Sequence, residues 1–271
     1  MRGPSRAALA EARQRLSEAV TSAAVARTLG EELFAILGVL DDEAGLRRAL
    51  SDSSRPEQAR AELARRLFGD QVSEATLSLF TSMCESRWST AADLASAVEE
   101  IAVTAFAAAA ERGRHLDDLE DQLFRFGRVV MSAPELRTVL SDPTIPAQYK
   151  AQLLDTLLEG KVTADSLALI GEAAEHTRGR SVDMTLDRYA QWTAQWRQRL
   201  IAVARVALPL TDRQRGRLIA ALEGVYGHEI HLDVIVDPRV EGGISVQIGD
   251  EFIDGSVASR LGALRRRLAA R

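Results

Sequence analysis

The sequence has one cysteine, Cys84, in 271 residues. A single cysteine excludes an internal disulfide, and the cysteine content gives no sign of an oxidising compartment. No apolar run approaches the roughly 18–20 residues that a membrane-spanning helix needs. The Ala-rich start of the chain is interrupted by Glu11, Arg13 and Arg15, so it lacks the unbroken apolar core of a signal peptide. We therefore expect a soluble protein with a cytoplasmic address.

Nucleotide-binding motifs are also missing. The sequence contains no G-x-x-x-x-G-K-[ST] and no G-x-G-x-x-G, and Gly242-Gly243 lacks the lysine and the helix that such loops require. The net charge of −5 argues against a phosphate-binding surface over the whole protein. One basic cluster near the end fits either the cationic last turn of a solvated helix or a contact with nucleic acid or lipid. It consists of Arg265, Arg266, Arg267 and Arg271.

Candidate metal ligands and catalytic groups have simpler structural explanations. His228 and His231 would lie on opposite faces of a strand, with no cysteine nearby, which argues against a metal site. Cys84 lies at helical spacing from Leu77 and Phe80, which predicts a buried thiol without an activating base. An acidic run is expected to form the polar face of an amphipathic helix. It contains Asp117, Asp118, Glu120 and Asp121.

Trp192 and Trp196 fit core packing, or a protein-interface anchor if they are exposed. Asp254, Ser256 and Arg260 are explained by a turn, a helix cap and an ion partner. The sequence therefore predicts no catalytic residue, no metal and no cofactor.

Most of the chain repeats itself at an offset of 90 residues without a gap. Leu33-Phe34 matches Leu123-Phe124, and Leu50-Ser51-Asp52 matches Leu140-Ser141-Asp142. Loop residues such as Pro56 and Pro146 also match, which core periodicity alone does not require. We interpret this pattern as a tandem duplication of a helical unit.

One helix is expected to close the first unit and to open the second. It begins near Thr90, and its residues Ala102, Phe106 and Ala109 match Ala12, Leu16 and Ala19. The predicted domains are a first bundle over 1–110, a second bundle over 90–200 that shares the helix near 90–112, and a C-terminal domain over 201–271. No Gly/Ser-rich or Pro-rich spacer separates the bundles, which predicts a rigid connection.

The hydrophobic period changes from 3.6 to 2 after Leu200. "LIAVARVALPL" predicts a strand, a helix follows from Thr211, and alternating apolar residues predict further strands around 230–236 and 244–248. Gly242-Gly243 permits a turn between them, and Ser256 is placed to cap a last helix. The predicted fold class is α+β: a duplicated helical bundle followed by a small mixed domain.

The order "VDP…GGI.V.IGD..IDGSV..RL" resembles the C-terminal signature of the delta subunit of F-type ATP synthases, the oligomycin-sensitivity-conferring protein of mitochondria. The close resemblance covers roughly residues 200–271, and "VARVALPLTDRQRGRLIAALE" fits the strand and helix that precede the signature. The signature residues, which we expect to be structural, are Asp237, Pro238, Gly242, Gly243, Gly249, Asp254, Gly255, Ser256 and Arg260.

The resemblance implies a non-catalytic peripheral-stalk subunit. In the family, the helical bundle holds the N-terminal segments of the alpha subunits of the catalytic head, and the C-terminal domain meets the membrane-anchored b-type stalk. Association with the cytoplasmic face of the membrane would then occur only through the complex. No nucleic acid is expected as a partner. The second bundle is expected to make the usual contact with the head, and the first bundle is expected to add reach or further contacts with the stalk. The common form of the family has one bundle, so the extra unit departs from it.

Ala-rich helix faces offer shallow grooves in which a partner helix could dock, or they pack within their own bundle. The candidate groove consists of Ala102, Ala105, Phe106 and Ala109. The alternative function is a cytoplasmic helical-repeat adaptor whose tail, Arg265 to Arg267, binds nucleic acid. Strong salt dependence of RNA binding would favour that alternative.

Overall fold

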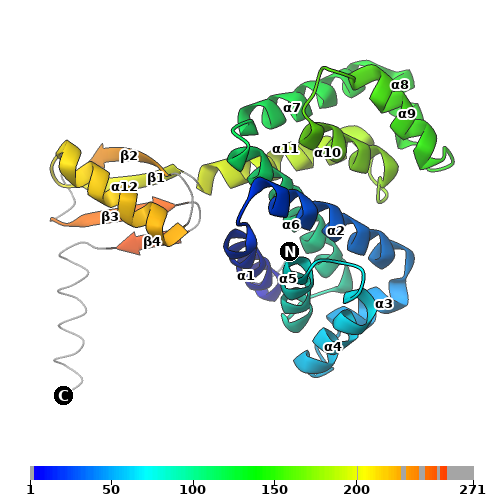
Figure 1. Ribbon diagram of the computed structural model, residues 1–271, viewed down its shortest axis with the longest axis horizontal. Helices are drawn as coiled ribbons and strands as arrows, with labels where there is room; N and C mark the ends of the chain where they lie inside the picture. Colours follow the sequence, from blue (N-terminus) through cyan, green and yellow to red (C-terminus); the bar gives the residue numbers. More distant parts are fainter. Residues whose placement is uncertain (1–2, 200, 227–229, 238–241, 249–250, 255–271) are drawn as a thin grey trace. The chain divides into compact units, whose positions relative to one another are not determined.

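The computed structural model describes residues 3–199, 201–226, 230–237, 242–248 and 251–254. These residues form twelve helices and four strands (Figure 1). The chain divides into two compact units, residues 1–193 and 194–271. The first unit is entirely helical, and the second contains the sheet, so the predicted α+β class is confirmed.

The helices before the sheet vary from short connectors to long core elements. They are α1 (Gly3–Ala19), α2 (Ala23–Asp42), α3 (Ala44–Ser51), α4 (Glu57–Phe68), α5 (Glu74–Glu85), α6 (Ala91–Arg112), α7 (Leu116–Ser132), α8 (Pro134–Ser141), α9 (Ala147–Leu158), α10 (Ala164–Glu175) and α11 (Val182–Arg199). We name α1–α6 the first bundle and α6–α11 the second bundle. Both names include α6.

The helix bounds repeat at the offset seen in the sequence. The limits of α3, α4 and α5 recur 90 residues later in α8, α9 and α10. Interhelical contacts recur as well. The N–H of Ser73 donates to the carboxylate of Glu32 at 3.0 Å, and the N–H of Thr163 donates to the side-chain oxygen of Gln122 at 2.8 Å. The first contact joins the start of α5 to α2, and the second joins the start of α10 to α7.

Hydroxyl side chains fix the starts of several helices, including the helix that the sequence predicts to begin near Thr90. The hydroxyl oxygens of Ser73 and Thr90 accept hydrogen bonds from the N–H groups of Thr76 and Asp93. Ser22 and Thr163 cap α2 and α10 in the same way. Each cap satisfies one N–H that the helix itself cannot pair.

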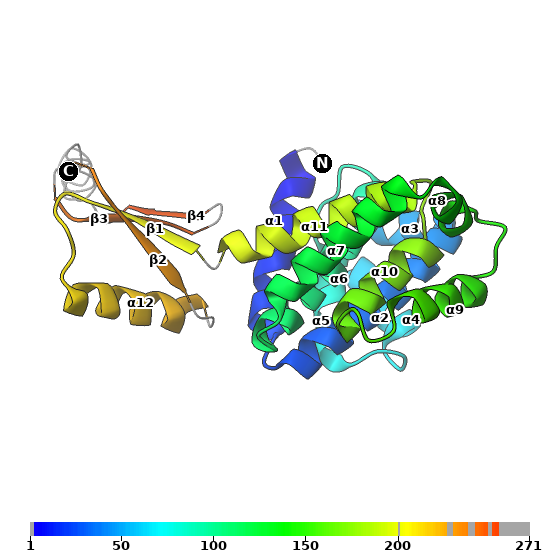
Figure 2. The same cartoon turned by 90° about the horizontal axis from the view of Figure 1, so that it is seen from above.

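The α6 helix is the centre of the helical unit. Every residue from 97 to 110 is buried, including the charged Glu99 and Glu100. A helix that packs on one neighbour shows one buried stripe, whereas burial on all faces requires neighbours all round. Figures 1 and 2 show α6 surrounded by helices of both bundles.

The C-terminal unit contains β1 (Ile201–Val206), α12 (Asp212–Tyr226), β2 (His231–Val236), β3 (Ile244–Ile248) and β4 (Glu251–Asp254). The sheet order is β2-β1-β3-β4, with β1 parallel to β2 and the other pairs antiparallel. Gly242 and Gly243 precede β3 with φ of 90° and 83°, which agrees with the predicted turn. Leu222 of α12 packs on the core formed by alternate residues of β1, β2 and β3.

Candidate partner interface

The groove predicted on α6 is not open in the described part of the chain. Ala102, Ala105 and Ala109 are fully buried, and Phe106 is 1% exposed. A Cβ added at Gly30 of α2 would lie 2.6 Å from the Phe106 ring. Helix α2 therefore covers this face, and the alanines serve close packing between helices of the same chain.

A buried ion cluster holds the two bundles together around α6. Glu99 is 2% exposed, and its carboxylate accepts hydrogen bonds from Arg180 and, at 3.3 Å each, from Arg178 and the Tyr189 hydroxyl. Burial and the nearby Glu99 raise the pKa of Tyr189 well above its ordinary value. The phenol therefore stays protonated and available as a donor to the carboxylate.

Arg178 connects three helices. Its guanidinium donates to Asp41 of α2 at 2.6 Å and to Glu172 of α10 at 2.6 Å, in addition to Glu99 of α6. Burial acts to lower the pKa of Arg178, but Tyr189 and the carboxylates together raise it. The backbone of Arg178 has φ of 50°, which a residue with a side chain rarely adopts. These three carboxylate contacts offset that strain.

A second ionic contact joins the bundles near the start of α10. Asp165 is fully buried, and one carboxylate oxygen accepts from Arg27 of α2 at 2.6 Å. The other oxygen lies 2.7 Å from Nε2 of His115, in the turn between α6 and α7. A buried carboxylate requires such partners because removal from water is costly.

Between the two ionic contacts, Phe34 of α2 packs into the second bundle. Its ring centroid lies 6.0 Å from that of Phe106 and 6.3 Å from that of Tyr189. Arg27, Phe34 and Asp41 are spaced by seven residues and so share one face of α2. We call the contact of this face with the second bundle the seam. It explains how the bundles form one compact unit.

Two of the three seam residues of α2 differ from the residues at the matching positions of α7. Ninety residues after Arg27, Phe34 and Asp41 stand Asp117, Phe124 and Met131 on α7, which we name the open stripe. Phe124 is 61% exposed and Met131 65% exposed, against 8% for Phe34. The same helix face is thus covered in the first bundle and uncovered in the second.

Exposed large apolar side chains gather on the second bundle beyond this stripe. The first bundle exposes Val39 and Leu67, and their matches Val129 and Leu157 are exposed too. The further exposed apolar side chains of α7–α11 in the described chain are Phe124, Met131, Val139, Tyr149 and Met184. In the described chain, the second bundle therefore exposes more large apolar side chains than the first.

A buried cation occupies a matched position in each bundle. Arg60 is 1% exposed and donates to the carbonyl oxygens of Cys84, Glu85 and Ser86, at the end of α5. Ninety residues later, Lys150 donates to the carbonyl oxygen of Ala174 at 2.8 Å, at the end of α10. Both cations satisfy carbonyls that a helix end leaves unpaired.

We expect Arg60→Met to lower the free energy of unfolding by about 2 kcal/mol, because it leaves one buried and two partly buried carbonyl oxygens without their donor. Arg60→Lys should cost only about 1 kcal/mol, since lysine performs this role at position 150. Urea unfolding followed by circular dichroism measures both. Equal losses for the two variants would show that Arg60 acts through its packing and not through its donors.

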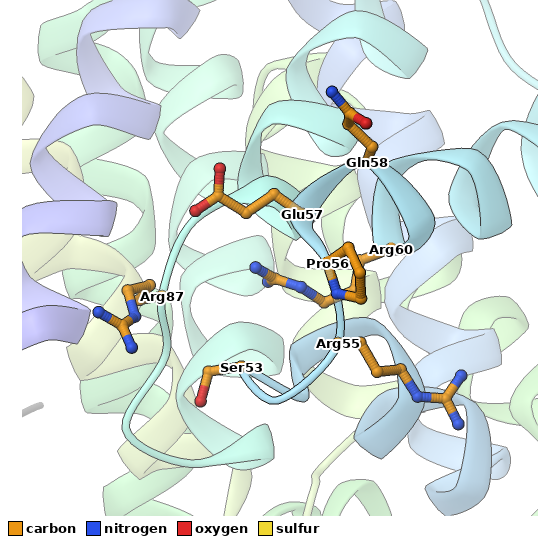
Figure 3. Close-up of a pocket in the computed structure, with 7 residues that line it drawn as sticks. All are labelled: Ser53, Arg55, Pro56, Glu57, Gln58, Arg60 and Arg87. Atoms are coloured by element: carbon orange, nitrogen blue, oxygen red, sulfur yellow. The ribbon is translucent and has the colours of Figure 1, made fainter.

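A polar hollow of about 380 Å³ lies at the start of α4. Figure 3 shows Arg60 in the middle of its lining, with Arg55 directed away from the other side chains. The hydrogen bonds of Arg60 to α5 already account for its charge. The lining residues are Ser53, Arg55, Pro56, Glu57, Gln58, Arg60 and Arg87.

The other predicted chemical groups have structural roles where they are described. Burial raises the pKa of the Cys84 thiol, which makes a thiolate nucleophile at this position unfavourable. Trp192 and Trp196 are buried, 7% and 2% exposed. Within the described ranges no group of three or more His, Cys, Asp and Glu is arranged to hold a metal ion. A search of the same residues finds no helix with the length and apolar character to cross a membrane.

Part of the C-terminal signature is described. The N–H of Asp237 donates to the carbonyl oxygen of Val206 at 2.9 Å, Gly242 and Gly243 have positive φ just before β3, and Asp254 ends β4. The remaining signature residues lie outside the described residues; these are Pro238, Gly249, Gly255, Ser256 and Arg260. His228 and the basic cluster of Arg265, Arg266, Arg267 and Arg271 also lie outside them.

Residues 98–268 match the model of the family described as ATP synthase delta (OSCP) subunit. The chain belongs to this family. The matched region begins within α6, so the family model covers most of the second bundle and the sheet unit, while α1–α5 precede it. The predicted resemblance is confirmed.

Curated delta subunits of the family match the whole length of the chain. An ATP synthase subunit delta of Streptomyces griseus is 47% identical over 270 residues, covering 99% of this chain and 100% of its own. Those of Thermobifida fusca and Acidothermus cellulolyticus are each 42% identical and cover 99% and 100% of this chain. These relatives therefore share the first bundle as well.

Among the solved structures that match is a chain of the Toxoplasma gondii mitochondrial ATP synthase hexamer. It is 21% identical, covers 62% of this chain and 98% of its own, and has a TM-score of 0.31. A likeness of this size adds nothing to the assignment, which rests on the family model and the curated relatives.

Proposed function

We propose that this chain is the non-catalytic peripheral-stalk subunit that links the top of the catalytic head to the b-type stalk of a proton-translocating F-type ATP synthase. Rotation would then be coupled to ATP synthesis because the head is held against rotor torque. The proposed partners are the N-terminal segments of the alpha subunits and the b-type stalk subunit. The proposed location is the cytoplasmic face of the cell membrane, reached through the complex.

Family membership over the whole chain is the observation that carries this proposal. The seam supports it mechanically. A brace must transmit force without bending, and α2 is tied to the second bundle by Arg27–Asp165, by Phe34 and by Asp41–Arg178. We further propose that the two bundles are tandem copies and that the extra copy extends this rigid brace.

A binding isotherm between the full chain and a synthetic N-terminal peptide of the alpha subunit of the same organism tests the contact with the head. We expect saturable one-to-one binding that persists at high salt, because apolar burial is little affected by screening. Absence of binding at both salt concentrations would remove this contact from the proposal. Strong salt-dependent RNA binding would instead favour the nucleic-acid adaptor.

Removing the first bundle by deleting residues 1–88 is not a clean test of which bundle contacts the head. The deletion would take away α2 and expose the face of α6 that contains Phe106, which is 1% exposed in the full chain. A misfolded second bundle would then look like lost binding. Surface substitutions in the full chain avoid this problem.

A further inference from the structure

We propose that the open stripe on α7, formed by Asp117, Phe124 and Met131, is a docking face for a helical segment of the b-type stalk. This inference rests on the proposed function and adds a stalk contact on the second bundle. In the seam, the matching face of α2 is covered by the second bundle.

The seam shows what kind of surface accepts such a stripe. Phe34 packs between side chains of two helices, Phe106 of α6 and Tyr189 of α11. Phe124 stands at the matching position of α7 and is 61% exposed. In Figure 1, α10 and α11 lie between α2 and α7. One side of the second bundle is thus covered by α2, while Phe124 on α7 stays exposed. In stacked helical repeats, an outermost face that needs no partner is normally polar.

The chemistry of the expected partner follows from the stripe. Arg27, Phe34 and Asp41 present a cation, an aromatic ring and an anion, whereas the open stripe presents an anion, an aromatic ring and a thioether. A matching helical surface would therefore offer apolar residues opposite Phe124 and Met131. The stripe spans two heptads, or roughly 21 Å at 1.5 Å per residue, which suits a helix of about four turns.

The small size of the stripe favours a stalk helix over a second copy of this chain. A phenylalanine side chain covers about 150–250 Å², so Phe124 and Met131 together offer far less than the roughly 800 Å² per partner of a stable interface. Such a contact becomes effective when the same partner is already held elsewhere, because tethering raises its local concentration. In the proposed function, the C-terminal domain supplies that tether for the b-type stalk.

The test compares the affinity of the full chain for the soluble part of the b-type stalk subunit, before and after Phe124→Asp with Met131→Asp. We expect binding about tenfold weaker, because two charges would enter an apolar contact. Phe124→Leu with Met131→Leu keeps the face apolar and should stay within about twofold of the wild type. Val39→Asp, on the exposed side of α2, is the matched control and should behave likewise. Thermal melts of all variants check folding.

The outcomes separate this inference from the proposed function. Unchanged stalk affinity of the aspartate variant overturns the docking face and leaves the peripheral-stalk role standing. If the aspartate variant loses binding to the alpha peptide but binds the stalk unchanged, the docking proposal is overturned too, because the face would then belong to the contact with the head. Self-association of the wild type that only the aspartate variant abolishes would assign the face to a second copy. A wild-type chain that does not bind the stalk segment overturns both proposals.

Discussion

Replacing Glu99 with glutamine is expected to lower the free energy of unfolding of the helical unit by about 3 kcal/mol. Glutamine keeps the shape of the side chain but leaves Arg178 and Arg180 without the carboxylate that they share. Removal of one partner from a buried ion pair typically costs about 3–5 kcal/mol. We expect a loss at the lower end of this range because Arg178 keeps its ion pairs with Asp41 and Glu172. Urea unfolding followed by tryptophan fluorescence measures this, since Trp88 and Trp192 lie in the helical unit.

The matched control is Arg125→Ala, which breaks the ion pair with Asp121 on the surface of α7. The side chain of Arg125 is 76% exposed, and exposed pairs of this spacing contribute only about 0.5 kcal/mol or less. The two variants therefore separate a buried ion pair from a surface one. A Glu99→Gln variant as stable as the Arg125→Ala variant would show that the cluster does not hold the bundles together.

Replacing Gly30 with valine is expected to cost about 3 kcal/mol by forcing α2 away from α6. A Cβ at this position would lie 2.6 Å from Cδ2 of Phe106 and 3.2 Å from the carbonyl oxygen of Ala102. The Phe106 ring cannot simply turn aside, because it is itself buried and packs against Phe34. Overpacking of a tight core usually costs about 1–3 kcal/mol, and the β-branch adds crowding. Chemical denaturation of the full chain measures the loss.

Gly38 provides the control within the same helix. Nothing lies within 4 Å of a Cβ built there. Gly38→Ala should therefore stabilise the protein by about 0.5–1 kcal/mol, because alanine is the better helix former. Gly30→Ala gains the same propensity but meets Phe106, so it should destabilise. If both alanine variants were stabilising, the contact between α2 and α6 would be looser than the structure shows.

A tightly closed seam has a consequence for the mechanics of the complex. Gly30 permits close approach of α2 and α6, while Arg27–Asp165 and Asp41–Arg178 fix α2 against α10 and the loop that follows it. Packed interiors resist deformation because they have little free volume. A subunit with two bundles joined in this way is suited to carry load between two partners, which agrees with the proposed function.

The sequence by itself determined the elements that depend on local chemistry. Ser73 and Thr90 start helices because their hydroxyls accept backbone hydrogen bonds nearby. Alternating apolar residues fixed the strands after Ile201, and the matches at an offset of 90 residues predicted the repeated bounds of α3–α5 and α8–α10. The C-terminal signature indicated the family. None of these inferences required knowledge of contacts between distant segments.

Only the tertiary structure decided which helix faces are covered. Phe34 and Phe124 are the same residue type at matching positions, yet one is buried in the seam and the other is 61% exposed. Local sequence pattern cannot distinguish them, because the difference comes from a bundle that packs on one and not on the other. The same reason explains why the alanines of α6, for which the sequence left a partner groove and packing within the bundle both open, lie beneath α2. Pairs such as Arg27 and Asp165 are 138 residues apart, so folding alone brings them together.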